Sequence, residues 1–121
     1  MRYMLLIYED RSTRPTNSDE KITTEYVAFA QAITDSKEMV AGDPLRGVDT
    51  ATSVRIRGGK PAVRDGPFAE TKEHLGGYFI VDVSDLDRAI ELASRIPAAR
   101  TGVVEIRPIW EAIGERTHRP V

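Results

Sequence analysis

Hydrophobic residues in this chain follow two different spacings, which divide it into predicted strands and helices. Residues 2–8 (RYMLLIY) are apolar at both odd and even positions, as in a strand that is buried on both faces. In residues 19–37, apolar side chains recur every three or four positions from Ile22 to Ile33. That spacing predicts an amphipathic helix.

The middle of the chain has the two-residue alternation of strands. Residues 39–41 are a short apolar run, and residues 50–65 alternate around the pair Gly58-Gly59. A Gly-Gly pair between two alternating runs predicts a hairpin with a tight turn of the primed type. Residues 77–83 form a further strand pattern that is again apolar on both faces.

A second helix and a last strand complete the pattern. Ser84 is the predicted N-cap, with Asp87 three residues later as in a capping box, and Pro97 ends the helix. Its expected buried stripe consists of Leu86, Ala89, Ile90, Ala93 and Ile96. Residues 102–109 are the last predicted strand, and Val104 and Ile106 share one of its faces.

This order of elements predicts an α+β fold in one domain. Strands dominate, and two helices of crossover length separate them, which is typical of a ferredoxin-like (split βαβ) sandwich. We expect an antiparallel sheet with both helices on one face, a domain that spans residues 1–111, and a loose tail at 112–121. Because the strands are apolar on both faces, the uncovered face predicts a homodimer, a dimeric α+β barrel-like assembly.

Composition narrows the classes of function. The chain has 121 residues, of which 40% are hydrophobic and 30% charged, and it contains no cysteine. Disulfides, cysteine nucleophiles and cysteine-bound metals are therefore excluded. The net charge of −2, with both signs interspersed, argues against a broad nucleic-acid-binding face. The apolar run at the N-terminus is too short for a signal peptide or a membrane span, which predicts a cytoplasmic protein with no membrane partner.

Residues 65–82 (DGPFAETKEHLGGYFIVD) combine a turn, a cluster of ionisable residues and the start of a strand. Asp65-Gly66-Pro67 is a turn by composition. The ionisable residues that follow are Glu70, Lys72, Glu73 and His74. Ionisable groups on a loop between two strands predict a functional site.

His74 is the best acid–base candidate in the sequence, because an imidazole ordinarily titrates near neutral pH. We predict that it acts as a general base, oriented by Asp65 or Glu70, and these three residues are the predicted catalytic groups. The alternative is a partly exposed loop histidine that bonds to backbone.

Charged and aromatic residues nearby are candidates for ligand binding. The predicted binding residues are Lys72, Glu73, Glu105, Arg107 and Tyr78. Equally, Glu70 and Glu73 can hold Lys72 or Arg107 in a structural network, with Arg107 as the anchor of the acidic loop. Tyr78 at strand spacing also suits a core or a dimer interface.

Signatures of cofactor and phosphate binding are missing from the sequence. It has no P-loop, no dinucleotide fingerprint, no metal-spaced histidines and no nucleophile elbow. We therefore expect neither a cofactor nor a metal, although a carboxylate-only metal site stays open. Four basic residues on the predicted hairpin are explained by a solvated, charge-protected edge or by contact with phosphate or RNA: Arg55, Arg57, Lys60 and Arg64.

The stretch Asp65–Glu73, the Leu75–Tyr78 segment that follows it and Glu105–Ile109 near the end carry a family resemblance. On these residues the chain resembles the YCII-related proteins, in the branch named after its DGPF motif. The resemblance implies a bacterial, dimeric, ferredoxin-like domain, in some members linked to extracytoplasmic-function sigma factors. It also implies, for the wider family, an active site built on a His/Asp pair with the histidine on the first helix. This chain departs from that pattern, because residues 17–40 contain no histidine.

Two main hypotheses of function follow. The first is a homodimer that binds a small organic molecule and catalyses a cofactor-free acid–base reaction of the lyase or hydrolase type. The alternative is a non-enzymatic sensor or protein-interaction module that works with a sigma factor or another regulator. A third possibility is that the central motif is purely architectural.

Overall fold

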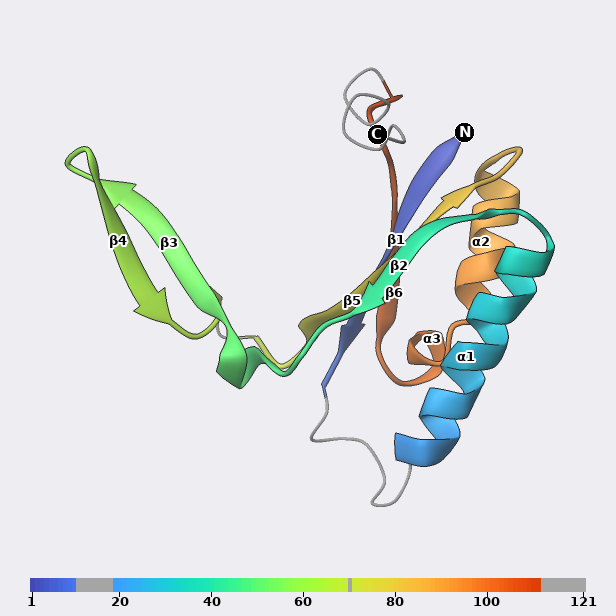
Figure 1. Ribbon diagram of the computed structural model, residues 1–121, viewed down its shortest axis with the longest axis horizontal. Helices are drawn as coiled ribbons and strands as arrows, with labels where there is room; N and C mark the ends of the chain where they lie inside the picture. Colours follow the sequence, from blue (N-terminus) through green and yellow to red (C-terminus); the bar gives the residue numbers. More distant parts are fainter. Residues whose placement is uncertain (11–18, 70, 112–121) are drawn as a thin grey trace.

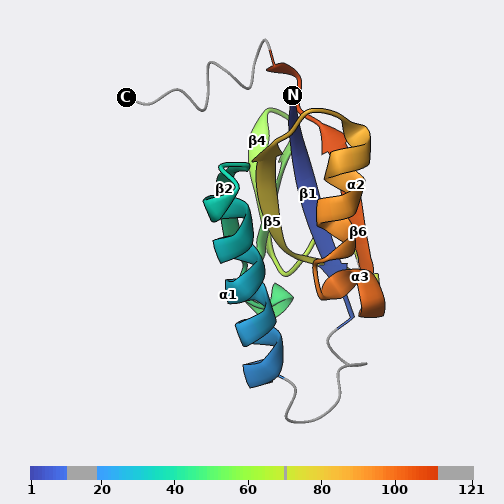
Figure 2. The same cartoon turned by 90° about the vertical axis from the view of Figure 1, so that its right-hand side faces the viewer.

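The computed structural model describes residues 1–10, 19–69 and 71–111. Glu70 and the predicted tail at 112–121 therefore lie outside the described residues. The core of the fold is one antiparallel sheet covered on one face by helices (Figures 1 and 2). The strands in sheet order are β2 (Met39–Pro44), β5 (His74–Asp82), β1 (Arg2–Glu9) and β6 (Val103–Pro108). The helices are α1 (Asp19–Asp35), α2 (Leu86–Ser94) and the short α3 (Ala98–Thr101).

The connections make two split βαβ units, which confirms the predicted α+β sheet. β5 pairs antiparallel with both β1 and β2, so β1 and β2 run parallel with β5 between them and α1 as the crossover. By the same reasoning β5 and β6 are parallel, separated by β1 and joined through α2. No helix in the described part of the chain is long and apolar enough to cross a membrane.

The hydrophobic core lies between the sheet and the helices. Odd-numbered residues of β1 point toward the helices and are buried: Tyr3, Leu5 and Ile7. Phe29 of α1 meets Phe79 of β5 edge to face, with ring centroids 5.1 Å apart, a favoured aromatic geometry. This contact fixes α1 over the β2–β5 half of the sheet (Figure 2).

The opposite face of the sheet is also apolar in its centre. The even residues of β1, which include Met4 and Leu6, are half-buried there. Ile80 lies directly opposite Met4 and is only 2% exposed. No helix of the described chain covers this face (Figure 1), in line with the two-sided apolar pattern in the sequence.

The helix α1 ends two residues earlier than the sequence pattern predicted, because Lys37 adopts a positive φ of 64°. The N–H of Lys37 donates to the carbonyl of Thr34, and the N–H of Glu38 donates to that of Ile33. These two hydrogen bonds form a Schellman motif, which normally favours glycine at the position of Lys37.

The N-terminus of α2 differs from the expectation. Asp85, not Ser84, is the N-cap, and its carboxylate accepts from the N–H of Arg88 at 2.9 Å. The predicted buried stripe was wrong at Leu86 and Ile90, which are 49% and 46% exposed. The buried residues of α2 are Ala89, Leu92 and Ala93, so the helix is rotated relative to the stripe that its sequence suggested.

The predicted hairpin forms a separate two-stranded sheet of β3 (Thr52–Arg57) and β4 (Lys60–Asp65). Its turn residues Gly58 and Gly59 have φ of 56° and 77°, as a type I′ turn requires. The hairpin projects from the body on the side away from the helices (Figure 1). A short 3-10 turn, η2 (Val48–Thr50), precedes it.

Candidate functional site

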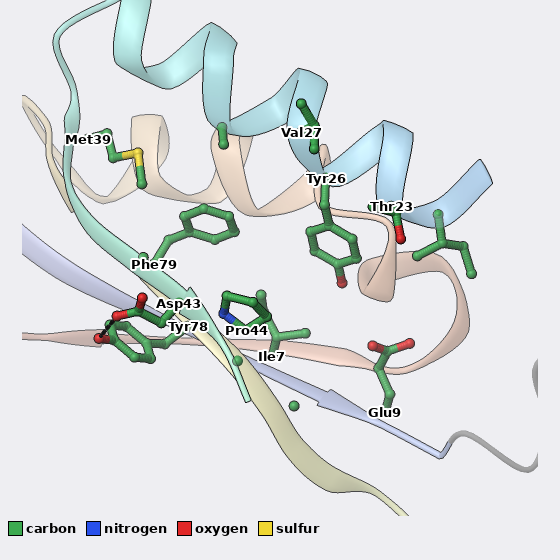
Figure 3. Close-up of a pocket in the computed structure, with 15 residues that line it drawn as sticks. Ile7, Glu9, Thr23, Tyr26, Val27, Met39, Asp43, Pro44, Tyr78 and Phe79 are labelled. Carbon is green, nitrogen blue, oxygen red and sulfur yellow. Dashed lines mark hydrogen bonds between the residues drawn. The ribbon is translucent and has the colours of Figure 1, made fainter. Parts of the chain in front are cut away.

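A cavity of about 400 Å³ lies between α1 and the β2–β5–β1 part of the sheet (Figure 3). Its walls are mostly apolar, as is usual for small-molecule sites of this size. The apolar lining comes from α1 and from the three strands: Ile7, Ile22, Val27, Ala30, Met39 and Phe79. The cavity therefore suits a small molecule with a largely apolar body.

Two glycines in the wall allow β2, β5 and their side chains to pack closely beside this space. A Cβ on Gly77 would lie 3.0 Å from the carbonyl oxygen of Asp43, and one on Gly42 would lie 2.5 Å from the ring of Phe79. Any larger residue would force the strand or the ring to move. Close packing thus explains Gly77, the second glycine of the Gly76-Gly77 pair in residues 65–82.

Polar groups enter the cavity from two sides. Tyr26 points its hydroxyl from α1 toward the sheet, and Glu9 points its carboxylate from the end of β1 toward the helix (Figure 3). The hydroxyl oxygen of Tyr26 is buried. Thr23 adds an exposed hydroxyl at the same rim. A few polar groups in an apolar wall can fix the orientation of a ligand.

A second, smaller hollow of about 80 Å³ adjoins the first. Both are lined by Glu9 and Gly76. The smaller hollow adds His74, which pairs across the strands with Glu9, and Arg46 from the segment after β2. Three residues with ionisable side chains, an acid, a histidine and an arginine, thus line one small space.

On the other face of the sheet, Tyr78 and Asp43 form a hydrogen bond. The hydroxyl of Tyr78 donates to Oδ2 of Asp43 at 2.6 Å, a contact that joins β5 to β2 (Figure 3). The hydrogen bond to the Asp43 carboxylate raises the pKa of Tyr78. Because the hydroxyl is already engaged, this pair ties the edge strand to the sheet.

Comparison with known proteins places the chain in a family. The YCII-related domain profile matches residues 1–113. The chain belongs to the YCII-related domain family. An uncharacterised protein of Rhizobium meliloti (strain 1021), R00369, is 32% identical over 114 residues, which cover 90% of this chain and 92% of that protein.

A solved structure shares the fold of this YCII-related domain. It is that of 5-chloro-2-hydroxyhydroquinone dehydrochlorinase (TftG) from Burkholderia phenoliruptrix AC1100, in complex with 2,5-dihydroxybenzoquinone. The match covers 90% of this chain and 93% of TftG with a TM-score of 0.51, at 12% sequence identity. At that identity the likeness shows a common fold.

The structure of this YCII-related domain separates the predicted catalytic residues. His74 lines the smaller hollow, but it is the first residue of β5, not a loop residue as the sequence suggested. Asp65 ends β4 and lines neither hollow. Glu70, the third predicted catalytic residue, lies outside the described residues. Of the two that the structure describes, His74 and Asp65, it brings His74 to a cavity and not Asp65.

The predicted binding residues are also dispersed. Lys72 and Glu73 are exposed in the segment before β5 and line neither hollow. Glu105 and Arg107 lie on β6, where Oε2 of Glu105 and Nε of Arg107 are 3.5 Å apart and both side chains are exposed. The ion pair found for Arg107 is thus with Glu105 of the same strand. Tyr78 is the one of the five binding candidates that lines the cavity, although its hydroxyl lies on the other face of the sheet, where it bonds to Asp43.

Three residues of the site were missed from the sequence: Glu9, Tyr26 and Arg46. In the sequence, Tyr26 has the spacing of the apolar stripe of α1, and Glu9 follows directly after the apolar run of residues 2–8. Sequence patterns do not report which strands pair. The pairing of Glu9 with His74, for example, joins residues that are 65 positions apart in the sequence. Within the described ranges, no three His, Asp or Glu side chains lie close enough together to hold a metal ion.

Proposed function

We propose that this protein binds a small, largely apolar organic molecule under α1 and acts on it as a cofactor-free acid–base enzyme of the lyase or hydrolase type. The observation that carries the proposal is the cavity of about 400 Å³ whose wall includes Glu9, a residue that it shares with the smaller hollow lined by His74. Apolar walls exclude water and strengthen the electrostatic effect of the few polar groups present.

In an elimination, the roles divide between these two side chains. Glu9 accepts a proton from the bound molecule, and the electron pair of that bond stays on the substrate and forms the new double bond. The leaving group departs with its own electron pair, and His74, when protonated, donates a proton to it. Two titratable groups on adjacent strands can serve these two steps because acid–base catalysis needs both in reach of one substrate.

The TftG comparison supports this proposal at the level of the fold. TftG is described as a dehydrochlorinase in complex with a small quinone, and dehydrochlorination is an elimination. The match spans nearly the whole of both chains, so the same scaffold holds a small ring compound in another protein. The roles proposed for Glu9 and His74 rest on the two hollows of this chain and not on residues of TftG.

The proposal includes a homodimer formed through the uncovered face of the sheet. Met4, Leu6 and Ile80 give this face an apolar centre, and such a face is normally buried against another layer. A second copy placed sheet to sheet gives the α+β barrel-like assembly expected from the sequence. The cavity lies on the helix side, so ligands reach it without separating the two copies.

A direct test is thermal-shift screening of small ring compounds, with 2,5-dihydroxybenzoquinone among them, on the wild type and two variants. Thr23→Trp places a large side chain at the exposed rim of the cavity, whereas Thr24→Trp adds the same side chain at an exposed position that does not line it. A ligand that binds the folded state raises the Tm by mass action.

We expect compounds that raise the Tm of the wild type and of Thr24→Trp but not of Thr23→Trp. If the ligand-induced shift is the same in Thr23→Trp as in the wild type, the ligand does not occupy this cavity. If no compound of the ring class shifts the Tm of any form, the proposed function is wrong.

The β3–β4 hairpin favours a second candidate, a protein-interaction module. Val54, Ile56 and Val63 share one of its faces and are 60%, 66% and 65% exposed. Their joint replacement by serine would abolish two-hybrid binding to a sigma factor or regulator if the hairpin holds such a partner. Retention of that binding would exclude the hairpin as its contact surface.

A further inference from the structure

We infer that the smaller hollow, lined by Arg46, His74 and Glu9, is an oxyanion subsite that selects ligands with one negatively charged oxygen group next to an apolar body. The inference rests on the proposed function and adds the chemical class of its ligand. The apolar body occupies the large cavity, and the oxygen group passes Gly76 into the hollow. Carboxylates, phenolates and enolates of ring-sized compounds belong to this class.

The size of the hollow sets the first limit on its occupant. A volume of about 80 Å³ has room for about two or three water molecules. A carboxylate or a phenolate oxygen with a water molecule fits there, whereas an aromatic ring does not. The ring must therefore stay in the larger cavity, whose walls are mostly apolar.

The two spaces adjoin at Gly76 and Glu9, which line both. Glycine has no side chain to block the passage, and a Cβ built there would approach only Oε1 of Glu9 and the carbonyl oxygen of Ile7, both at 3.9 Å. Nothing in the strand geometry therefore demands glycine at this position. An open connection between the hollows gives a reason for Gly76 that packing does not supply.

The backbone holds Arg46 close to this passage. The N–H of Leu45, the residue before it, donates to the carbonyl oxygen of Gly76 at 2.9 Å. Gly47 and Val48 on the other side of Arg46 also line the hollow. The segment is thus fastened to β5 at the residue that both cavities share, and a guanidinium that starts there is suited to a carboxylate or phenolate.

Arg46 and Glu9 carry opposite charges and therefore have opposite effects on the binding of an anion in the hollow. Arg46 attracts an anionic oxygen, and His74 donates a hydrogen bond to it or adds charge when protonated. Glu9 repels an anion while its carboxylate is ionised, and the repulsion ends when it takes up a proton. This division fits a base that removes a proton while the charge that develops on oxygen is stabilised by Arg46.

The test is isothermal titration with a matched pair of probes, 2-naphthoate and its neutral analogue 2-naphthamide. Arg46→Met removes the positive charge of the guanidinium and keeps an unbranched apolar side chain. Lys72→Met is the control, because Lys72 is an exposed cation that lines neither hollow. Glu9→Gln removes the negative charge and keeps the shape of the side chain.

We expect the wild type to prefer naphthoate over naphthamide and Arg46→Met to weaken naphthoate binding by about 3- to 10-fold, a range set by the exposure of Arg46. Glu9→Gln should strengthen naphthoate binding, and Lys72→Met should leave it unchanged. Each variant that changes naphthoate binding should change the binding of the neutral naphthamide by a smaller factor.

Three outcomes contradict the inference and separate it from the proposed function. If both probes bind the wild type equally, or if Arg46→Met keeps the preference for naphthoate, the oxyanion subsite is wrong while the cavity remains a binding site. If Lys72→Met weakens naphthoate binding as much as Arg46→Met, the effect is one of net charge and not of the hollow. If neither probe binds but other ring compounds raise the Tm, the oxyanion subsite is wrong and the cavity remains a binding site; if no ring compound binds at all, the proposed function fails as well.

Discussion

Glu38 and Arg88 form a bidentate ion pair between the residue before β2 and helix α2. Nε and Nη2 of Arg88 each donate to a different carboxylate oxygen of Glu38 at 2.8 Å. The side chains are 15% and 29% exposed. The hydrogen bonds from Arg88 lower the pKa of Glu38 from 4.5 to about 2.

This pair predicts a defined loss of stability in acid. Since the pKa of Glu38 is lower in the folded state, its contribution is complete above about pH 4.5 and is lost as the pH falls toward 2. Glu38→Gln should lower the free energy of unfolding by about 1–2 kcal/mol at pH 7 and flatten its pH dependence between these values. Urea denaturation from pH 2.5 to 7 measures both.

Glu91→Gln is the control for that experiment. Glu91 also bonds to Arg88, but its side chain is 56% exposed, so its removal should cost less than that of Glu38. Equal losses for the two variants would show that the Glu38 pair has no special contribution.

The catalytic roles of Glu9 and His74 make a second prediction at this scale. With any ring substrate that the protein turns over, Glu9→Gln and His74→Asn should each lower kcat by about 10²- to 10⁴-fold, the usual contribution of acid–base groups. Asp65→Asn, at a residue outside both hollows, should keep the rate. If steady-state kinetics show that Asp65→Asn loses activity while Glu9→Gln keeps it, then Asp65 is a catalytic residue, as the sequence predicted, and Glu9 is not.

At the scale of elements, the junction of α3 and β6 with β1 depends on Gly102. A Cβ at this position would lie well inside van der Waals contact of the carbonyl oxygen of Tyr8, so the backbone would have to shift. Gly102→Ala should destabilise the fold by about 1–3 kcal/mol, as overpacking does. Gly76→Ala is the matched control, with its nearest atoms at 3.9 Å, and should change the stability far less. Denaturation midpoints compare the two, and equal effects would contradict this packing.

The sequence predicted most elements because their residue patterns are local. The alternation around Gly58-Gly59 gave the hairpin, and the spacing from Ile22 to Ile33 gave α1. The stripe of α2 was partly wrong because Leu86 and Ile90 are as apolar as Leu92, and only the docking of the helix decides which of them faces the sheet. The start of β5 at His74 depends on pairing with Glu9, which no local pattern reports.

The candidate site was harder to predict from the sequence than the fold. The ionisable cluster of the sequence ends at the start of β5, where His74 lines the smaller hollow. Its neighbours in space come from β1 and from the segment after β2, because strand register brings together residues that are far apart in sequence. Asp65, although closer in sequence, pairs with Thr52 at the base of the hairpin and lines neither hollow.

At the scale of the whole molecule, the uncovered face of the sheet predicts self-association. Leu6 lies at the centre of β1 on that face, between Tyr78 of β5 and Glu105 of β6. Leu6→Asp should convert a wild-type dimer into a monomer, because a second carboxylate beside Glu105 at the centre of an apolar interface is costly. Leu86→Asp, on the exposed surface of α2, should remain dimeric. Sedimentation velocity distinguishes the two states, and a monomeric wild type would exclude the dimer.

The central claim is that a small apolar molecule binds between α1 and the sheet. NMR of the protein with a bound ring compound such as 2-naphthoate tests this claim most directly. We predict intermolecular NOEs from the ring protons to the methyl groups of Ile7, Ile22 and Met39, which line the cavity. NOEs to Met4 and Leu6, on the opposite face of the sheet, without any to the cavity methyls would contradict it.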